Sequence, residues 1–372
     1  MKRTKLLYII SGIDYSLGFE WLEKYMDKSR YETEFVFLHH QPPQLYDLFS
    51  GKGVKVYFLR LNTKKEYPMV FFKLFSLIRR VSPDIVHCHL LEASLLGLPA
   101  AKLAGVKKRV YTRHHSTFHF DYHPRMVKVD RFINAMATGI AAITENVRRV
   151  LVEREKVDPR KVFIVHHGFE LACFQDVEQG LVDALTLKYN PAHKRPVVGV
   201  ISRFTEWKGI RYTIEAFNML LGEYPDAMLI LANAKGDGEA EINARLGELP
   251  PGTYCKIVFE KEVCALYRIF DIFVHVPVDS FAEAFGQTYV EALAAGIPSV
   301  FTLSGIANEF VKDGINALVV PYKNSGAIGE AMKRLLVNNE LRTSLVLEGQ
   351  KEVKQKFPVE VMMNALYRMY EA

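Results

Sequence analysis

Short apolar runs alternate with longer amphipathic segments along this chain of 372 residues. The runs are rich in β-branched and aromatic residues, which is typical of strands buried on both faces of a parallel sheet. In the first half they lie at Lys5–Ile10, Glu34–His39, Val54–Leu59, Ile85–His89, Arg109–Thr112, Gly139–Ile143 and Val162–His166. The helical segments between them include Phe19–Asp27, Val70–Val81, Glu92–Ala104 and Asn146–Glu155. This alternation predicts an α/β fold with a doubly wound parallel sheet.

The pattern begins a second time after Arg195-Pro196. Strands are expected at Val197–Ile201, Met228–Leu231, Lys256–Phe259, Ile272–Val276, Ser299–Phe301 and Ala317–Val319, and helices at Ile210–Leu221, Ala265–Phe270, Tyr289–Ala295 and Gly326–Val337. We therefore predict two Rossmann-like domains, residues 1–185 and 196–355, joined by a polar linker within Val182–Arg195, and a terminal helix in 356–372. Ligands of such sheets bind beyond the carboxyl ends of the strands, so we expect the chemistry in the loops there, facing a central cleft.

Composition and charge narrow the class of protein. With 49% hydrophobic and 12% aromatic residues, the chain is not disordered. Residues 1–190 carry 29 Lys and Arg against 20 Asp and Glu, whereas the remainder carries 19 against 22, so the net charge of +6 divides into +9 and −3. The basic half could face phosphate groups or anionic lipid, or could be an ordinary solvated surface.

Targeting signals and a disulfide framework are not expected. The apolar run Leu6–Ile10 is too short for a signal peptide, and no stretch reaches the ~18 apolar residues of a membrane-spanning helix. Four scattered cysteines are too few for a disulfide scaffold. These features predict a cytoplasmic protein that touches, at most, the inner surface of a membrane.

The segment 280–298 places two carboxylates around a predicted helix start. Glu283 precedes the helix and Glu291 lies about one turn inside it. The residues that open the helix are Phe285, Gly286, Gln287 and Thr288, with Thr288 as the expected cap. Free backbone N–H groups at a helix start suit phosphate or polyol oxygens, and a carboxylate can accept two hydroxyl protons from a vicinal diol. The pattern therefore indicates a nucleotide-sugar site, the alternative being an ordinary exposed helix start.

A second motif, Ser202–Gly209, directly follows one predicted strand and precedes a helix. Arg203 offers a bidentate fork to phosphate oxygens and Lys208 a compact positive charge. Together with the helix N-terminus they favour a pyrophosphate clamp over the alternative of a surface loop with two basic side chains.

Together these segments resemble the retaining glycosyltransferases of family four, which have the two-domain GT-B fold. The Arg-x4-Lys-Gly and Glu-x7-Glu patterns match that family's donor-site motifs. Further matches, spread over nearly the whole chain, are Asp84–His89, Val110–His114, Ser304–Val320 and Tyr367–Tyr370. The last match implies a terminal helix that crosses back onto the first domain.

The resemblance implies an activity and its partners. It predicts transfer of a sugar, with retention of anomeric configuration, from a nucleotide diphosphate sugar, preferably a UDP-sugar, to a hydroxyl of a glycan or lipid-linked acceptor. Surface polysaccharide or glycolipid synthesis is the expected setting. Neither a metal ion nor a cofactor is expected, because cationic side chains and helix dipoles stabilise the leaving diphosphate in this fold. Nucleic acid is not an expected partner.

The resemblance also implies residue roles. Arg203 and Lys208 would bind the donor diphosphate, Glu291 the ribose, and Glu283 the transferred sugar, helped by the backbone of Phe285, Gly286 and Gln287 beside Thr288. In the first domain, His114 would lie near the primary hydroxyl of the donor sugar, with its neighbour His115 as the alternative. Gly12 would let the backbone approach the phosphate and the acceptor.

Other features leave alternatives open. His115, His119 and His123 are four residues apart, which permits a zinc site, but a histidine-rich loop lining the acceptor pocket fits the composition better. The segment Met69–Arg80 is expected to be a core helix, the alternative being a helix that faces a membrane. Rival functions are a sugar-nucleotide epimerase on the same fold, a non-catalytic nucleotide-sugar or glycan-binding module, and a two-domain solute-binding protein.

Overall fold

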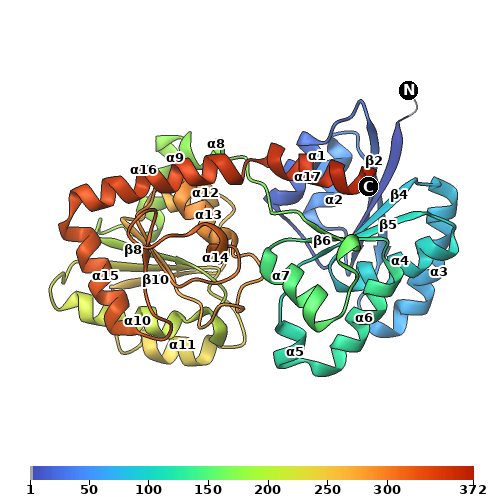
Figure 1. The fold of residues 1–372 in the computed structure, drawn as a ribbon. Helices are drawn as coiled ribbons and strands as arrows, with labels where there is room; N and C mark the ends of the chain where they lie inside the picture. The colour runs from blue at the N-terminus through green and yellow to red at the C-terminus, as the bar shows by residue number, and fades with distance from the viewer. Residues whose placement is uncertain (1–2) are drawn as a thin grey trace. The chain divides into compact units, whose positions relative to one another are not determined.

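The computed structural model describes residues 3–372 and divides them into two compact units (Figure 1). Unit 1 contains the chain up to Phe169 together with Val359–Ala372, and unit 2 contains Glu170–Pro358. Each unit has its own open parallel sheet, with helices in the connections between strands. The predicted fold class, two Rossmann-like α/β domains, is confirmed.

The sheet of unit 1 has seven strands in the order β3-β2-β1-β4-β5-β6-β7, all paired in parallel. The strands are β1 (Thr4–Ser11), β2 (Tyr31–His39), β3 (Lys55–Arg60), β4 (Ile85–His89), β5 (Lys108–Arg113), β6 (Gly139–Ala142) and β7 (Val162–Ile164). The strand order reverses between β1 and β4, where Leu6 lies opposite Ile85. Open α/β sheets bind their ligands beyond the strand ends at such a reversal.

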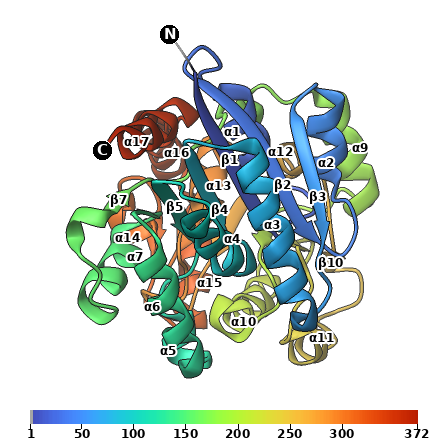
Figure 2. The ribbon, with the colours of Figure 1, turned by 90° about the vertical axis from the view of Figure 1, so that its right-hand side faces the viewer.

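Helices cover both faces of this sheet, so its central strands are apolar throughout and Leu7, Ile9 and Val36 are fully buried. The helices are α1 (Leu17–Tyr25), α2 (Gln44–Gly51), α3 (Tyr67–Val81), α4 (Leu91–Leu103), α5 (Phe118–Tyr122), α6 (Val127–Met136), α7 (Glu145–Arg149) and α17 (Val359–Glu371). Figure 2 shows α3 and α4 in front of the strands on one face.

The sheet of unit 2 has six parallel strands in the order β10-β9-β8-β11-β12-β13, with the reversal between β8 and β11. The strands are β8 (Val197–Ile201), β9 (Met228–Ala232), β10 (Tyr254–Ile257), β11 (Ile272–His275), β12 (Ser299–Phe301) and β13 (Leu318–Val319). The helices are α8 (Ala172–Gln175), α9 (Gln179–Tyr189), α10 (Ile210–Leu221), α11 (Glu239–Leu246), α12 (Val263–Tyr267), α13 (Gln287–Ala294), α14 (Ala307–Phe310), α15 (Ser325–Val337) and α16 (Asn339–Lys356). Buried side chains of β8, β9 and β11 pack with those of α10 and α15 to form the core.

The division between the units falls earlier in the chain than the expected linker. The first part of that linker is helical, because α9 buries Leu185 and its end is fixed to unit 2. The Tyr189 hydroxyl donates to Glu260 at 2.6 Å, and Lys188 forms an ion pair with the same carboxylate at 3.1 Å. Residues 170–195 therefore belong to the second unit.

The terminal helix α17 belongs to unit 1, where it packs on α1, β6 and β7. The buried Tyr370 hydroxyl lies 2.6 Å from the Tyr8 hydroxyl and 2.6 Å from Nδ1 of His87. Near the same end of the helix, the Tyr367 hydroxyl accepts the backbone N–H of Asp27 at 2.7 Å. Unit 1 is thus completed by the last residues of the chain.

Helix α3 has one buried and one exposed face. Its residues Val70, Leu74, Leu77, Ile78 and Val81 pack inward, as expected for a helix that covers the sheet. On the opposite face Met69 is 49% and Phe72 67% exposed, beside the exposed side chains of Lys73, Arg79 and Arg80. Within residues 3–372, none of the helices combines the length and apolar character that crossing a bilayer requires.

Candidate functional site

The two motifs of the second half leave neighbouring strands at the reversal of the unit 2 sheet. The Ser202–Gly209 loop follows β8, and the loop that carries Glu283 follows β11, which pairs directly with β8. The backbone N–H of Val278 donates to the carbonyl of Trp207 at 3.0 Å, so the loops are also joined to each other. Parallel strands thus deliver both motifs to the edge of the sheet where ligands bind.

The first loop turns sharply before α10. Its residues Glu206–Lys208 form a single 3-10 turn, and Gly209 follows with a φ of +69°. A side chain at this position would collide with the carbonyl of Val276, so only glycine fits between the two loops. The turn directs Lys208 toward the second loop, while Arg203 is exposed.

Glu283 is the centre of a buried polar cluster. Its Oε1 lies 2.5 Å from Nζ of Lys208 and 2.9 Å from Nε2 of His275, the last residue of β11. Its backbone N–H donates to the hydroxyl of Ser304 at 2.9 Å, which fixes the loop from the other side. The carboxylate therefore has a defined position between a cation and an imidazole.

The charges of this cluster are fixed by its surroundings. Burial raises the pKa of Glu283, but Lys208 and His275 outweigh that effect and bring it to about 2, so the group is ionised at neutral pH. Burial lowers the pKa of His275 despite the opposing effect of Glu283. The imidazole is therefore neutral and donates its single N–H, on Nε2, to Glu283. The other ring nitrogen, Nδ1, carries no hydrogen and has no partner within the described chain.

Helix α13 begins two residues earlier than a Thr288 cap would require. Its N-cap is Gly286, with a φ of +83°, and Thr288 is the second helical residue. The cap prediction is therefore wrong: a Cβ at Gly286 would lie 2.7 Å from the ring of Tyr289, so the turn needs glycine rather than a hydroxyl side chain. The start of the helix still presents unpaired backbone N–H groups, as every helix N-terminus does.

Glu291 lies in the second turn of α13. Its Oε2 accepts the hydroxyl proton of Tyr267, at the end of α12, at 2.8 Å. Burial raises the pKa of Glu291 to about 7, and the hydrogen bond from Tyr267 only partly offsets this effect. The carboxyl group is therefore poised between its neutral and ionised forms at physiological pH.

Among the side chains to which the sequence assigns donor or acceptor roles, the structure brings Lys208 and Glu283 into contact. No hydrogen bond or ion pair of residues 3–372 joins Arg203 or Glu291 to that pair, although both belong to the same unit. Phe285 is buried, and its carbonyl accepts the N–H of Ile306 at 2.8 Å. The backbone groups of Gln287 and Thr288, and the hydroxyl of Thr288, lie in the first turn of the helix.

Two contributing residues were not among the sequence predictions. His275 ends an apolar strand, where a histidine is easily assigned to the core, and only its position eight residues before Glu283 hints at a pair. Tyr267 ends a short helix whose pattern gives no sign that its hydroxyl holds Glu291. Both contacts are set by the packing of separate elements and have no local signature.

His114 and Gly12 belong to unit 1, in the loops that follow β5 and β1. Nε2 of His114 lies 3.1 Å from Nδ1 of His89, and its ring stacks on that of His167 at 5.7 Å. Burial, together with His89 and His167, lowers the pKa of His114 well below its usual range, so the imidazole is neutral. Gly12 has a φ of +65°, and nothing lies within 4 Å of the place a Cβ would occupy.

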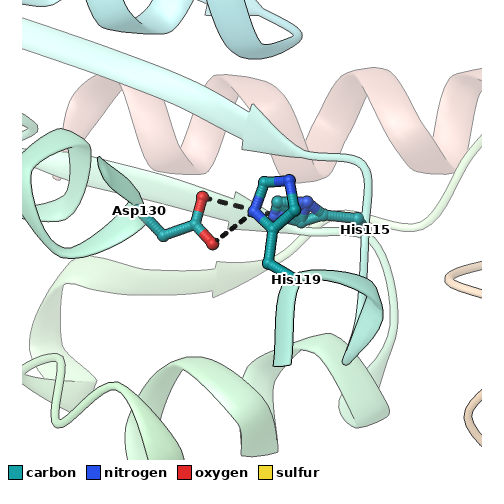
Figure 3. Close-up of side chains that lie close together, drawn as sticks. All are labelled: His115, His119 and Asp130. Carbon is teal, nitrogen blue, oxygen red and sulfur yellow. Dashed lines mark hydrogen bonds and ion pairs between the residues drawn. The ribbon is translucent and has the colours of Figure 1, made fainter. Parts of the chain in front are cut away.

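Two of the three histidines that are spaced four residues apart lie close together, and Asp130 takes the place of His123 beside them. Figure 3 shows His115 and His119 turned toward Asp130 of α6, and His123 is not part of this group. Asp130 Oδ2 lies 2.7 Å from Nδ1 of His119, and its Oδ1 lies 3.4 Å from Nε2 of His115. The buried Arg113 also binds Asp130, at 3.2 Å. The carboxylate is thus paired within the chain, and it stabilises the loop beside His114.

Comparison with protein families covers most of the chain with two matches. Residues 22–172 match the model described as Glycosyltransferase Family 4, and residues 184–352 match Glycosyl transferases group 1. The first match lies almost wholly within unit 1 and the second lies within unit 2.

Individual proteins give the same picture. The chain is 23% identical over 304 residues to the capsular polysaccharide biosynthesis glycosyltransferase CapM of Staphylococcus aureus, covering 80% of this chain and 79% of that one. It is 27% identical over 268 residues to the alpha-monoglucosyldiacylglycerol synthase of Acholeplasma laidlawii, covering 65% and 64%. The structure of Anabaena Alr3699/HepE in complex with UDP and glucose has a similar fold, with a TM-score of 0.85, 17% identity and full coverage of both chains.

Proposed function

Because the chain belongs to glycosyltransferase family four, we propose that it transfers a sugar from a UDP-sugar to a hydroxyl of a glycan or lipid-linked acceptor, with retention and without a metal ion. The observation that carries this proposal is the contact of Lys208 with the ionised Glu283 beside the start of α13. Relatives named for capsular polysaccharide and glycolipid synthesis support the class of acceptor.

The donor is held in unit 2 by groups of opposite character. Lys208 keeps two of its three N–H donors for the diphosphate while the third stays on Glu283, and Arg203 adds a bidentate donor. The ionised Glu283 accepts hydroxyl protons of the transferred sugar. Glu291 accepts those of the ribose.

The reaction proceeds on one face of the sugar. The bond between the anomeric carbon and the diphosphate breaks first, and Lys208, Arg203 and the first amides of α13 stabilise the negative charge that develops. The departing phosphate oxygen then takes the proton of the acceptor hydroxyl, whose oxygen bonds to the anomeric carbon on the same face. No protein nucleophile is required, and His114 contributes a neutral hydrogen-bonding group near the sugar.

Calorimetric titration of the protein with UDP, GDP and their sugars tests which donor binds, and we expect binding of a UDP-sugar. A transfer assay with an added acceptor, run in the presence of a chelator, tests the reaction. We expect an α-anomeric donor to give an α-linked product. A β-linked product would contradict retention, and loss of turnover in the chelator would contradict metal independence. An epimer formed from the donor alone would instead identify an epimerase, and binding without turnover a non-catalytic module.

A lipid-linked acceptor is supported by the exposed face of α3. Met69 and Phe72 project from the same helix as Lys73, Arg79 and Arg80, in the half of the chain that carries a net charge of +9. Apolar side chains flanked by cations favour binding to an anionic membrane surface. We propose that this face brings unit 1 to the bilayer that holds the acceptor.

Sedimentation with vesicles tests the membrane contact. The protein should bind vesicles rich in phosphatidylglycerol and not those of phosphatidylcholine, and Phe72→Ser combined with Arg79→Glu should abolish binding. Leu187→Ser, which alters an equally exposed apolar residue of unit 2, is the matched control and should bind as the wild type does. Equal binding of both variants would contradict the assignment to α3.

A further inference from the structure

Two cysteines of unit 2 meet beside the ribose-binding carboxylate. Cys173 of α8 and Cys264 of α12 are 91 residues apart in the chain, and their Sγ atoms lie 2.7 Å from each other. Both side chains are half-buried, so a small reagent can reach them. Cys88, in contrast, is fully buried in β4 of unit 1, and the Sγ of Cys255 in β10 lies 4.0 Å from the carbonyl oxygen of Lys256.

The cysteine pair is connected to Glu291 through a single residue. Cys264 and Tyr267 are three residues apart on α12 and so share one side of that helix. The Tyr267 hydroxyl donates to Glu291, and the ring of Phe174, next to Cys173, packs edge-on against the Tyr267 ring at 6.0 Å. A covalent bond between the two sulfurs would therefore fix α8 to α12 next to the residue that orients Glu291.

We propose that Cys173 and Cys264 form a reversible disulfide that couples the thiol redox state to nucleotide-sugar binding in unit 2. The coupling rests on the proposed function of Glu291, whereas the disulfide itself does not. In the thiol form, which the structure describes, Tyr267 donates to one oxygen of Glu291, and α12 has no covalent bond to α8. The disulfide would tie α12 to α8, so that Tyr267 keeps that oxygen from the ribose hydroxyls and the donor binds less tightly.

The bond forms by thiol–disulfide exchange with a small disulfide such as oxidised glutathione. The exchange begins when the thiolate of one cysteine attacks the small disulfide. We assign this step to Cys173, because a hydrogen bond with Cys173 and burial raise the pKa of Cys264. A mixed disulfide forms and one glutathione thiolate leaves. Cys264 then gives up its proton and displaces the second glutathione, so the protein is oxidised by two electrons and the reagent is reduced to two thiols.

Peptide mass spectrometry tests the bond without reference to activity. After treatment of the whole protein with oxidised glutathione, the peptides that carry Cys173 and Cys264 should appear as one species lacking two hydrogens, and dithiothreitol should separate them. Cys173→Ser and Cys264→Ser should each abolish this species, whereas Cys255→Ser should not. Only glutathione adducts, or a bond that involves Cys255, would overturn the proposal.

Calorimetric titration with UDP tests the coupling. We expect the oxidised wild type to bind UDP about fivefold or more weakly than the reduced protein, and Cys173→Ser to bind equally under both conditions. A disulfide that forms with no change in affinity would refute the coupling alone. If the reduced protein binds no nucleotide at all, the proposed donor site is wrong, while the peptide experiment still decides whether the disulfide exists.

Discussion

At the scale of single residues, the proposed binding of the donor depends on a buried cation and a buried carboxylate that the fold brings into contact. Lys208 and Glu283 lie in the loops that follow two neighbouring strands, and both side chains are largely buried. Replacing Lys208 by Ala removes one preorganised donor to the leaving diphosphate, which should cost about 2–4 kcal/mol of transition-state stabilisation. We expect kcat/KM for sugar transfer to fall by about 30- to 1000-fold.

The matched control for this variant is Lys235→Ala, which removes an exposed lysine after β9, the strand on the other side of β8. It should leave kcat/KM unchanged. Equal activity of both variants would show that Lys208 has no part in the transfer.

Glu291 predicts a pH dependence of donor binding. Burial raises its pKa to about 7, so the carboxylate that accepts ribose hydroxyls becomes more abundant as the pH rises from 6 to 8. The affinity for a UDP-sugar should therefore increase over that range, by up to about tenfold in total, with most of the increase between pH 6 and 7. Titration calorimetry with the intact UDP-sugar, whose diphosphate does not itself titrate there, measures this dependence.

Glu291→Gln should bind the UDP-sugar more weakly and with a flat profile from pH 6 to 8. Glu283→Gln should keep the pH dependence of the wild type, since the pKa of Glu283 is about 2 and lies outside that range. A flat profile in the wild type would contradict the role of Glu291.

The charged residues of the proposed donor site could be selected from the sequence because each lies in a motif with its own local spacing. Lys208 and Glu283 were expected to serve one ligand, and the structure places them 2.5 Å apart. The partners His275 and Tyr267 could not be predicted. Their roles depend on which strand ends and helices adjoin, and that information is not local to either residue.

At the scale of elements, the start of α13 depends on a backbone that only glycine adopts easily. Gly286 has a φ of +83°, and an added Cβ would lie 2.7 Å from Tyr289. Gly286→Ala should therefore destabilise the protein by about 1–2 kcal/mol through backbone strain and should also displace the amides that face the donor. Thermal unfolding and UDP-sugar titration measure the two effects.

Gly314→Ala is the control that separates the loss of stability from the loss of donor affinity. Gly314 also has a positive φ, of +69°, but nothing lies within 4 Å of its added Cβ. This variant should lose similar stability and keep full affinity for the donor. If Gly286→Ala also binds normally, the start of α13 does not contact the donor.

Every strand of both sheets could be predicted, because most are apolar runs bounded by polar residues and buried on two faces. The edge strands β3 and β10 are only partly buried, but they keep the same apolar pattern. Helices α2 and α9 could not. Helix α2 has only eight residues, and the apolar residues of α9 do not share one face, since Leu185 is buried and Leu187 is 65% exposed. Helix α9 is stabilised by the contacts of its last residues with Glu260. Tertiary contacts of this kind override local preference.

At the scale of the whole molecule, the last helix is part of the first unit. Tyr370→Phe would leave Nδ1 of the buried His87 without its partner, which should cost about 1–3 kcal/mol of unfolding free energy. The unfolding temperature should fall by roughly 2–4 °C for each kcal/mol. Tyr224→Phe is the control, since its hydroxyl has no hydrogen bond within the described residues, and an equal decrease in both variants would contradict the role of Tyr370.

The placement of α17 also determines when unit 1 can be completed during synthesis on the ribosome. Unit 2 is continuous, from Glu170 to Pro358, and all of it is translated before Val359. At typical elongation rates this delay is roughly 10–40 s, during which the nascent first sheet has no access to the tyrosine hydroxyls of the final helix. Unit 1 therefore leaves the ribosome first but is the last to acquire its full set of native contacts.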